Sequence, residues 1–222
     1  MSSTHDYSSP VSALLQLGDP NDTADWAAYG EMGIMAAHIA ELGRMATDRA
    51  LCESDTDFEY WGPVHAWQAL SLFPTPESIP PLITALAEFS DDPDLMEWTG
   101  ETLTVVLGRM GGAALSGLVE LLGDDQQADL ARENAVLAIT AIYNQYSETR
   151  SDCVVALTQQ LSKFAQNDPG LNGYLVTALA ADFKAVESAA VIEQAYAAER
   201  VDEAFIGDWN AAQVELGLKA PA

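Results

Sequence analysis

The three histidines, His5, His38 and His65, are the first side chains in this sequence that could transfer protons or bind a metal. They form no H-E-x-x-H or H-x-x-x-H pattern, so we expect no helical zinc site. His65 lies in the stretch WGPVHAW, which begins at Trp61. Such aromatics are typical of core packing, and the alternative is a histidine–aromatic patch that holds a ligand or a partner side chain. Trp61 and His65 are therefore candidate binding residues.

Carboxylates alternate with other residues in the stretch ESDTDFE, residues 53–59. Alternating carboxylates could converge on Ca²⁺, but an EF-hand loop needs Gly at its sixth position and Glu at its twelfth. Counted from Glu53, these positions hold Phe58 and Val64. We therefore interpret the stretch as a solvated loop, with a docking loop for a basic partner as the alternative. Its candidate binding residues are Asp55, Asp57 and Glu59.

The remaining catalytic motifs are missing from the sequence. Cys52 and Cys153 are the only cysteines, and they form no C-x-x-C pair. The glycines of LGRMGG, residues 107–112, do not follow a strand and are typical of a helix end rather than a phosphate loop. Ser116 has no G-x-S-x-G around it. The sequence therefore predicts no enzyme, no cofactor and no metal site.

The chain of 222 residues carries 34 acidic and 9 basic side chains, a net charge of −25. This charge repels phosphate backbones and anionic lipid, so we expect neither nucleic acid nor membrane as a partner. The charge is spread evenly, with 11 acidic and 2 basic residues in 1–60, 13 and 3 in 61–150, and 10 and 4 in 151–222. An even spread favours general solvation, while a surface for a basic partner and a mimic of nucleic acid are the alternatives.

The N-terminus MSSTHDYSSP has neither a basic nor an apolar segment of the kind that a secretory signal needs. No apolar run approaches the roughly 18 residues of a membrane-spanning helix. We therefore expect a cytoplasmic protein with reduced cysteines.

Apolar residues recur at steps of three and four along most of the chain, and strand signals are nearly absent, so we expect an all-α protein. One register repeats five times, as in Leu115, Leu118 and Leu122. Its middle residues, at 42, 82, 118, 157 and 192, are 40, 36, 39 and 35 residues apart. The repeat predicts helical hairpins of 35 to 40 residues, with an ordinary helical bundle as the alternative. We expect the second helices to start near 34, 76, 113, 150 and 185.

Four stretches resemble HEAT-like repeats: HIAELGRMATD (38–48), WGPVHAWQALSLF (61–73), residues 160–202, and GDWNAAQVELGL (207–218). More specifically, they resemble uncharacterised bacterial proteins related to the repeats of phycobilisome lyases. The resemblance implies an α-solenoid with an inner and an outer helix layer, and it implies no reaction. We expect an N-terminal segment at 1–29 that is partly disordered, a repeat domain at 30–218 and a tail at 219–222.

The resemblance also implies that the second helix of each hairpin lines the concave face. Residues two positions after the register residue are polar in all five repeats, and a turn of about 200° carries them away from the core. We therefore expect a non-catalytic scaffold that binds a protein or peptide, for which a basic partner fits the charge. The alternatives are a bilin lyase or chaperone of the phycobilisome type and an acidic nucleic-acid mimic. The expected binding residues on this face are Arg44, Thr84, Glu120, Gln159 and Gln194.

Overall fold

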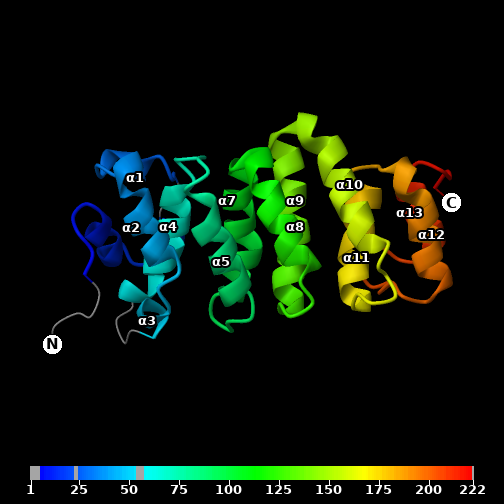
Figure 1. Cartoon of the computed structure of the whole chain (residues 1–222), viewed down its shortest axis with the longest axis horizontal. Helices are drawn as coiled ribbons and strands as arrows, with labels where there is room; N and C mark the ends of the chain where they lie inside the picture. Colours follow the sequence, from blue (N-terminus) through cyan, green and yellow to red (C-terminus); the bar gives the residue numbers. More distant parts are fainter. Residues whose placement is uncertain (1–5, 23–24, 54–57, 222) are drawn as a thin grey trace.

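The computed structural model describes residues 6–22, 25–53 and 58–221. Within these ranges the chain forms α-, 3₁₀- and π-helices joined by turns, and no strand, so the predicted all-α class is confirmed. The helices follow one another along the long axis of the molecule, and the two chain ends lie at its opposite ends (Figure 1). Each helix packs mainly on its neighbours along this axis.

The five helices that we expected as the second members of hairpins all form. Each of these helices contacts the next one of the five along the chain. The contacting pairs are α2–α5, α5–α8, α8–α10 and α10–α12. They make up what we call the second-helix row. Its members are α2 (Ile39–Ala46), α5 (Ile79–Phe89), α8 (Leu115–Gly123), α10 (Arg150–Leu161) and α12 (Ala189–Ala197).

These helices begin at or a few residues after the predicted starts. Four of them follow a short 3₁₀-helix, whose tighter turn takes up the residues that the sequence assigned to the α-helix. These 3₁₀-helices are η3 (Ala36–His38), η6 (Gly111–Ala114), η7 (Ser147–Thr149) and η9 (Val186–Ser188).

The other helices form a first-helix row, in which α4 contacts α7, α7 packs against α9, and α9 contacts α11. Two of its members contain a π-helical segment. The row consists of α4 (Gly62–Leu70), then α6 (Met96–Trp98) with η5 (Thr99–Leu103) and α7 (Thr104–Arg109), then α9 (Asp129–Gln145), then α11 (Pro169–Thr177) with η8 (Ala178–Asp182), and α13 (Trp209–Glu215).

The core lies between the two rows. The middle residue of every predicted register is fully buried, because residues three and four apart share the helix face that meets the other row. Burial of a leucine side chain contributes about 1.5–3 kcal/mol, so five equivalent positions supply a repeated share of the stability. These five residues are Leu42, Leu82, Leu118, Leu157 and Ile192.

Of the Asp-Pro pairs at 92–93 and 168–169, only the pair at 168–169 caps an α-helix directly. Asp168 caps α11: its carboxylate accepts a hydrogen bond from the backbone N–H of Gly170 at 2.7 Å, while Pro169 takes the first helical position. Asp92 accepts from the backbone N–H groups of Asp94 and Leu95 at 3.0 and 3.3 Å. The Asp92-Pro93 pair therefore closes a turn before α6 and does not cap the helix itself.

The described part of the N-terminal segment predicted at 1–29 contains short helices that pack on the first hairpin. It contains η1 (Val11–Gln16), η2 (Pro20–Asp22) and α1 (Ala28–Glu31), and η1 contacts α4. Val11 and Leu14 are fully buried. The physical reason is that the first hairpin has no neighbour on its outer side, so an apolar segment must cover its core.

Two short helices complete the first hairpin: α3 (Arg49–Cys52) and η4 (Glu59–Trp61). No single helix of the described ranges is both long and apolar enough to cross a membrane. Residues Met96–Arg109 and Gly111–Gly123 meet that test only together, and a bend of 117° separates them.

Candidate binding groove

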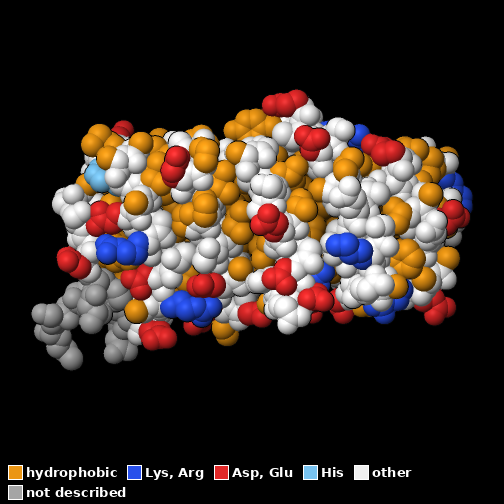
Figure 2. All heavy atoms as spheres, in the orientation of Figure 1, with side chains coloured by type: hydrophobic (Ala, Val, Ile, Leu, Met, Phe, Trp, Pro, Cys, Tyr) orange, Lys and Arg blue, Asp and Glu red, His pale blue; other side chains and the backbone are white. Residues whose placement is uncertain are grey.

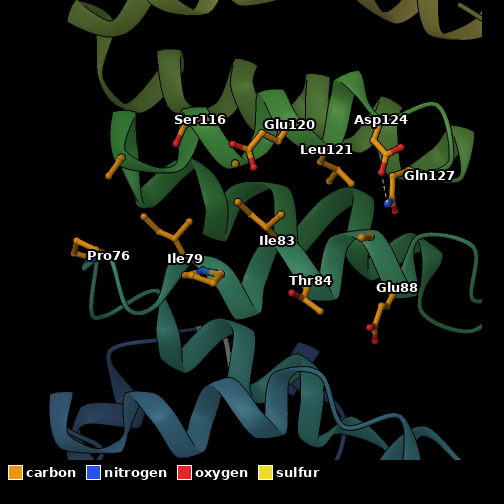
Figure 3. Close-up of a pocket in the computed structure, with 14 residues that line it drawn as sticks. Pro76, Ile79, Ile83, Thr84, Glu88, Ser116, Glu120, Leu121, Asp124 and Gln127 are labelled. Atoms are coloured by element: carbon orange, nitrogen blue, oxygen red, sulfur yellow. Dashed lines mark hydrogen bonds between the residues drawn. The ribbon is translucent and has the colours of Figure 1, made fainter.

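A hollow with a volume of about 830 Å³ lies on the second-helix row, between α5 and α8 (Figure 3). The two helices run in the same direction, because each is the second member of its hairpin. The turn before α5 closes one end at Pro76, and the turn after α8 closes the other at Gln127. We call this hollow the α5–α8 groove.

Two stripes of side chains, one on each helix, form its rims. Residues four apart lie one above the other on a helix, so each stripe covers positions i, i+4 and i+8. The position that the sequence singled out is the middle of each stripe. The stripes are Pro80, Thr84 and Glu88 on α5, and Ser116, Glu120 and Asp124 on α8 and just after it.

The floor of the groove is apolar. Ile79 and Ile83 supply it from α5, and Leu121 from α8. Gly117 allows the two helices to come close there, because a Cβ atom at this position would lie only 2.4 Å from Cδ1 of Ile83. Gly117 is therefore a point of close helix–helix approach.

The polar end of the groove holds carboxylates and no basic lining residue. The Asp124 carboxylate accepts hydrogen bonds from the Gln127 side chain at 2.9 Å and from the backbone N–H of Gln126 at 3.0 Å, which lower the pKa of Asp124. The carboxylate of Glu88 forms a solvent-exposed ion pair with Nε of Arg49, at 3.6 Å. Asp124 therefore stays charged at neutral pH.

The predicted row of five polar residues is exposed at every position, but only its centre lines the groove. Thr84 lines it from α5, and Glu120 lines it from α8 (Figure 3). Arg44 instead donates a hydrogen bond to the Asp6 carbonyl oxygen at 2.6 Å and lies 4.5 Å from the centre of the Tyr7 ring. Gln159 and Gln194 lie on α10 and α12, outside the groove.

The structure describes three of the five residues of the predicted aromatic and acidic patch. Asp55 and Asp57 lie outside the described residues. Glu59 and Trp61 are half-buried, and Trp61 packs against Trp98 with ring centres 5.3 Å apart. Of the two interpretations of Trp61, core packing fits these contacts.

His65 is fully buried, so it cannot line a surface patch, and the core interpretation replaces the ligand-binding one. One ring nitrogen, Nδ1, lies 2.8 Å from the Tyr29 hydroxyl, and the other, Nε2, lies 2.8 Å from the Gly18 carbonyl oxygen. Burial lowers the pKa of His65. Tyr29 and Gly18 come from the N-terminal segment, which is why the sequence around His65 could not reveal its surroundings.

Within the described ranges the side chains form neither a reactive thiol site nor a metal site. Burial raises the pKa of Cys52 to about 12, and it also raises the pKa of Cys153, so both thiols stay protonated. No group of three or more His, Cys, Asp or Glu side chains in this part of the chain could hold a metal ion.

Comparison with known proteins gives a family but no activity. Residues 47–217 match the model of a family described as "Protein of unknown function (DUF1186)". The chain belongs to this family. No curated protein and no solved structure matches it. The match covers every helix of the α5–α8 groove and stops short of the N-terminal segment that buries His65.

Sequence reasoning missed most of the groove residues of this family member, although a signal for them exists. The rims extend one turn before and one turn after the predicted position, at Pro80 and Glu88 and at Ser116 and Asp124. Extending the polar position by four residues in each direction finds all of them. The floor gives no such signal, because it depends on which side chains two neighbouring hairpins bring together.

Proposed function

We propose that this chain is a non-catalytic scaffold that binds a segment of another protein in the α5–α8 groove. The observation that supports this function is the position of the groove, which contains two of the five positions that the repeat predicts as binding residues. A continuous apolar floor between polar rims suits a peptide segment that contributes both side chains and backbone.

We further infer that the hairpins form an α-solenoid of the HEAT-like type. The recurrence of buried register residues every 35 to 40 positions and the two rows of neighbouring helices support this inference. In a solenoid each repeat contacts only its neighbours, so the grooves between second helices form one extended surface.

The dimensions of the groove favour a segment of a protein over a small metabolite. Three positions four residues apart extend along about 12 Å of helix, which four residues of an extended peptide can match. The groove is open along its length between the two rims, whereas small-molecule sites enclose most of their ligand.

Site-specific photocrosslinking tests the proposed function. The photoreactive amino acid p-benzoylphenylalanine would replace Thr84 in the groove, and, as a matched control, Val105, which is exposed on α7 in the other row. We expect a discrete crosslinked protein from the Thr84 position and none from the Val105 position.

The captured partner would then be purified and its Kd measured against two variants. Ser116→Trp fills the groove from an exposed position and should weaken binding about tenfold or more, since it excludes the segment from the floor. Val105→Trp adds the same side chain on the other row and should leave the Kd unchanged. Equal Kd values for wild type and Ser116→Trp would refute the proposed function.

A further inference from the structure

The α5–α8 groove changes character along its length. At the N-terminal ends of the two helices its lining is apolar or small, with Pro76, Pro80 and Ala113. At the C-terminal ends it holds the carboxylates of Glu88 and Asp124. Because α5 and α8 run in the same direction, the lining changes from apolar to acidic in the same direction on both sides of the groove (Figure 3).

The helix ends strengthen the negative end. The C-terminus of an α-helix carries a partial negative charge from carbonyl groups that have no partner within the helix. Figure 2 shows carboxylates gathered along the lower edge of the molecule, where the turns after α5 and α8 lie in Figure 1. A cation near this edge would therefore interact with both side chains and helix ends.

The chain's own arginines show that these helix ends accept guanidinium groups. Arg49 donates a hydrogen bond to the Glu88 carbonyl oxygen at the end of α5. Arg132 donates one from Nε to the Leu122 carbonyl oxygen at the end of α8, at 3.0 Å. The other two carboxylates of the groove, those of Glu120 and Asp124, make no ion pair with a basic residue among the described residues.

The protein has few cations to spare for these carboxylates. All six arginines of the chain already donate a hydrogen bond to an acceptor elsewhere in the fold, and five of the acceptors are backbone carbonyl oxygens. Arg49 already forms an ion pair with Glu88 at the rim of the groove, so a cation that pairs with Glu120 or Asp124 would come from another molecule. The acceptors are Asp6 for Arg44, Glu88 for Arg49, Ser71 for Arg109, Leu122 for Arg132, Phe183 for Arg150, and Asn167 for Arg200.

We propose that the groove recognises a protein segment that combines an apolar anchor with a Lys or Arg side chain, in a fixed direction. The anchor lies on Ile79 and Ile83 between the starts of the helices, and the cation lies between Glu120 and Asp124. This inference rests on the proposed function and adds the chemistry and the direction of the bound segment.

Matched peptides test the chemistry. The probes are fluorescein-labelled ten-residue peptides with one Phe and one Arg placed three, four or seven residues apart in a Gly/Ser/Ala background. Otherwise identical sets carry Gln or Glu in place of Arg. In fluorescence anisotropy with the full chain, the best Arg peptide should bind about fivefold tighter than its Gln counterpart, because partly exposed ion pairs contribute at most about 1 kcal/mol.

A double-mutant cycle separates the groove from the general charge of the protein. The variant Glu120→Gln with Asp124→Asn should abolish the preference for Arg over Gln. The control, Glu97→Gln with Glu101→Gln, removes two exposed charges from the first-helix row and should keep the preference within about twofold. An equal loss in both variants would show that the whole charge attracts the peptide, and it would overturn the inference.

The direction is tested by replacing Phe with p-benzoylphenylalanine and locating the crosslink by mass spectrometry. Crosslinks to 76–83 or 113–117 support the proposed direction, and crosslinks confined to 120–127 overturn it. Equal binding of Arg and Gln peptides, or no binding of any Arg peptide up to about 1 mM, overturns the inference as well. Neither result touches the proposed function, which stands or falls on the Ser116→Trp comparison with the captured partner.

Discussion

At the scale of single residues, two titratable groups whose pKa values are shifted by burial, His65 and Glu133, lie outside the groove. His65 is fully buried under the N-terminal segment, and both of its ring nitrogens lie within hydrogen-bonding distance of residues from that segment. Glu133, on α9, is half-buried beside Asp129 and Asp168. Each makes stability depend on pH, and the two effects have opposite signs.

The depressed pKa of His65 predicts a loss of stability in mild acid. The unfolded chain binds a proton at this imidazole near pH 6.5, while burial disfavours the charged form in the folded state. The free energy of unfolding should therefore fall as the pH decreases from about 7.5 to 5.5 by this contribution. Urea unfolding of wild type and His65→Asn at both pH values measures it, and the variant should show the smaller acid loss. An identical pH dependence of the two proteins would contradict the prediction.

The raised pKa of Glu133 predicts that its contribution to stability decreases as the pH rises. Burial, followed by the negative charges of Asp129 and Asp168, raises its pKa to about 7. The folded state then binds more protons than the unfolded state between about pH 4.5 and 7, so the contribution of this group to stability decreases as the pH rises through 7. Glu133→Gln should be about 1 kcal/mol more stable than wild type at pH 8, a figure reduced for the solvent that reaches the side chain.

The advantage of Glu133→Gln should vanish as the pH falls below about 4.5, where the wild-type carboxyl becomes protonated in both states. The matching substitution Glu101→Gln, at an exposed position, should show no such pH-dependent gain. Melting temperatures over this pH range would reveal either pattern.

At the scale of elements, close helix contacts depend on a few glycines. Gly108 of α7 faces α9, and a Cβ atom there would lie 2.7 Å from Cβ of Ala141 and 3.0 Å from its backbone carbonyl carbon. Backbone cannot move aside as a side-chain end can, so this contact sets how near α7 lies to α9. The same argument applies less strictly to Gly117, which meets only the tip of Ile83.

Gly108→Ala should therefore destabilise the protein by about 1–3 kcal/mol, although alanine favours helix by about 1 kcal/mol over glycine. Gly30→Ala is the control, because Gly30 lies in α1 with no atom within 4 Å of its added Cβ. It should be neutral or slightly stabilising. Chemical denaturation of both variants decides the matter, and a Gly108→Ala protein as stable as wild type would mean that the two helices can separate freely.

At the scale of the whole molecule, the net charge of −25 on 222 residues is a source of self-repulsion. Sodium chloride shortens the Debye length from about 30 Å at 0.01 M to about 8 Å at 0.15 M. The melting temperature should rise over this range, because screening relieves repulsion in the compact state more than in the expanded one. A melting temperature that stays level or falls would show that the charges are paired locally.

A variant that removes exposed charge should respond less to salt. Replacing Glu97, Glu101 and Glu193 with Gln lowers the charge at three exposed positions without touching the groove. We expect it to melt higher than wild type at 0.01 M salt and to gain less on going to 0.15 M.

The sequence by itself determined the all-α class and which face of each helix in the second-helix row is buried. Leu42, Leu82, Leu118, Leu157 and Ile192 are buried as predicted, because spacing at three and four residues is a local property of one helix. The exposure of the polar positions two residues later follows from the same geometry. These features need no knowledge of what lies across the helix interface.

Only the tertiary structure decided where the groove lies and which candidate residues belong to the core. The groove depends on α5 and α8 meeting at Gly117, two hairpins whose relative position no local pattern contains. The burial of His65 depends on Tyr29 and Gly18, which are 36 and 47 residues away in the sequence. Contacts over such distances arise from the packing of whole elements, and the physical reason is that periodicity identifies a buried face without identifying the partner that covers it.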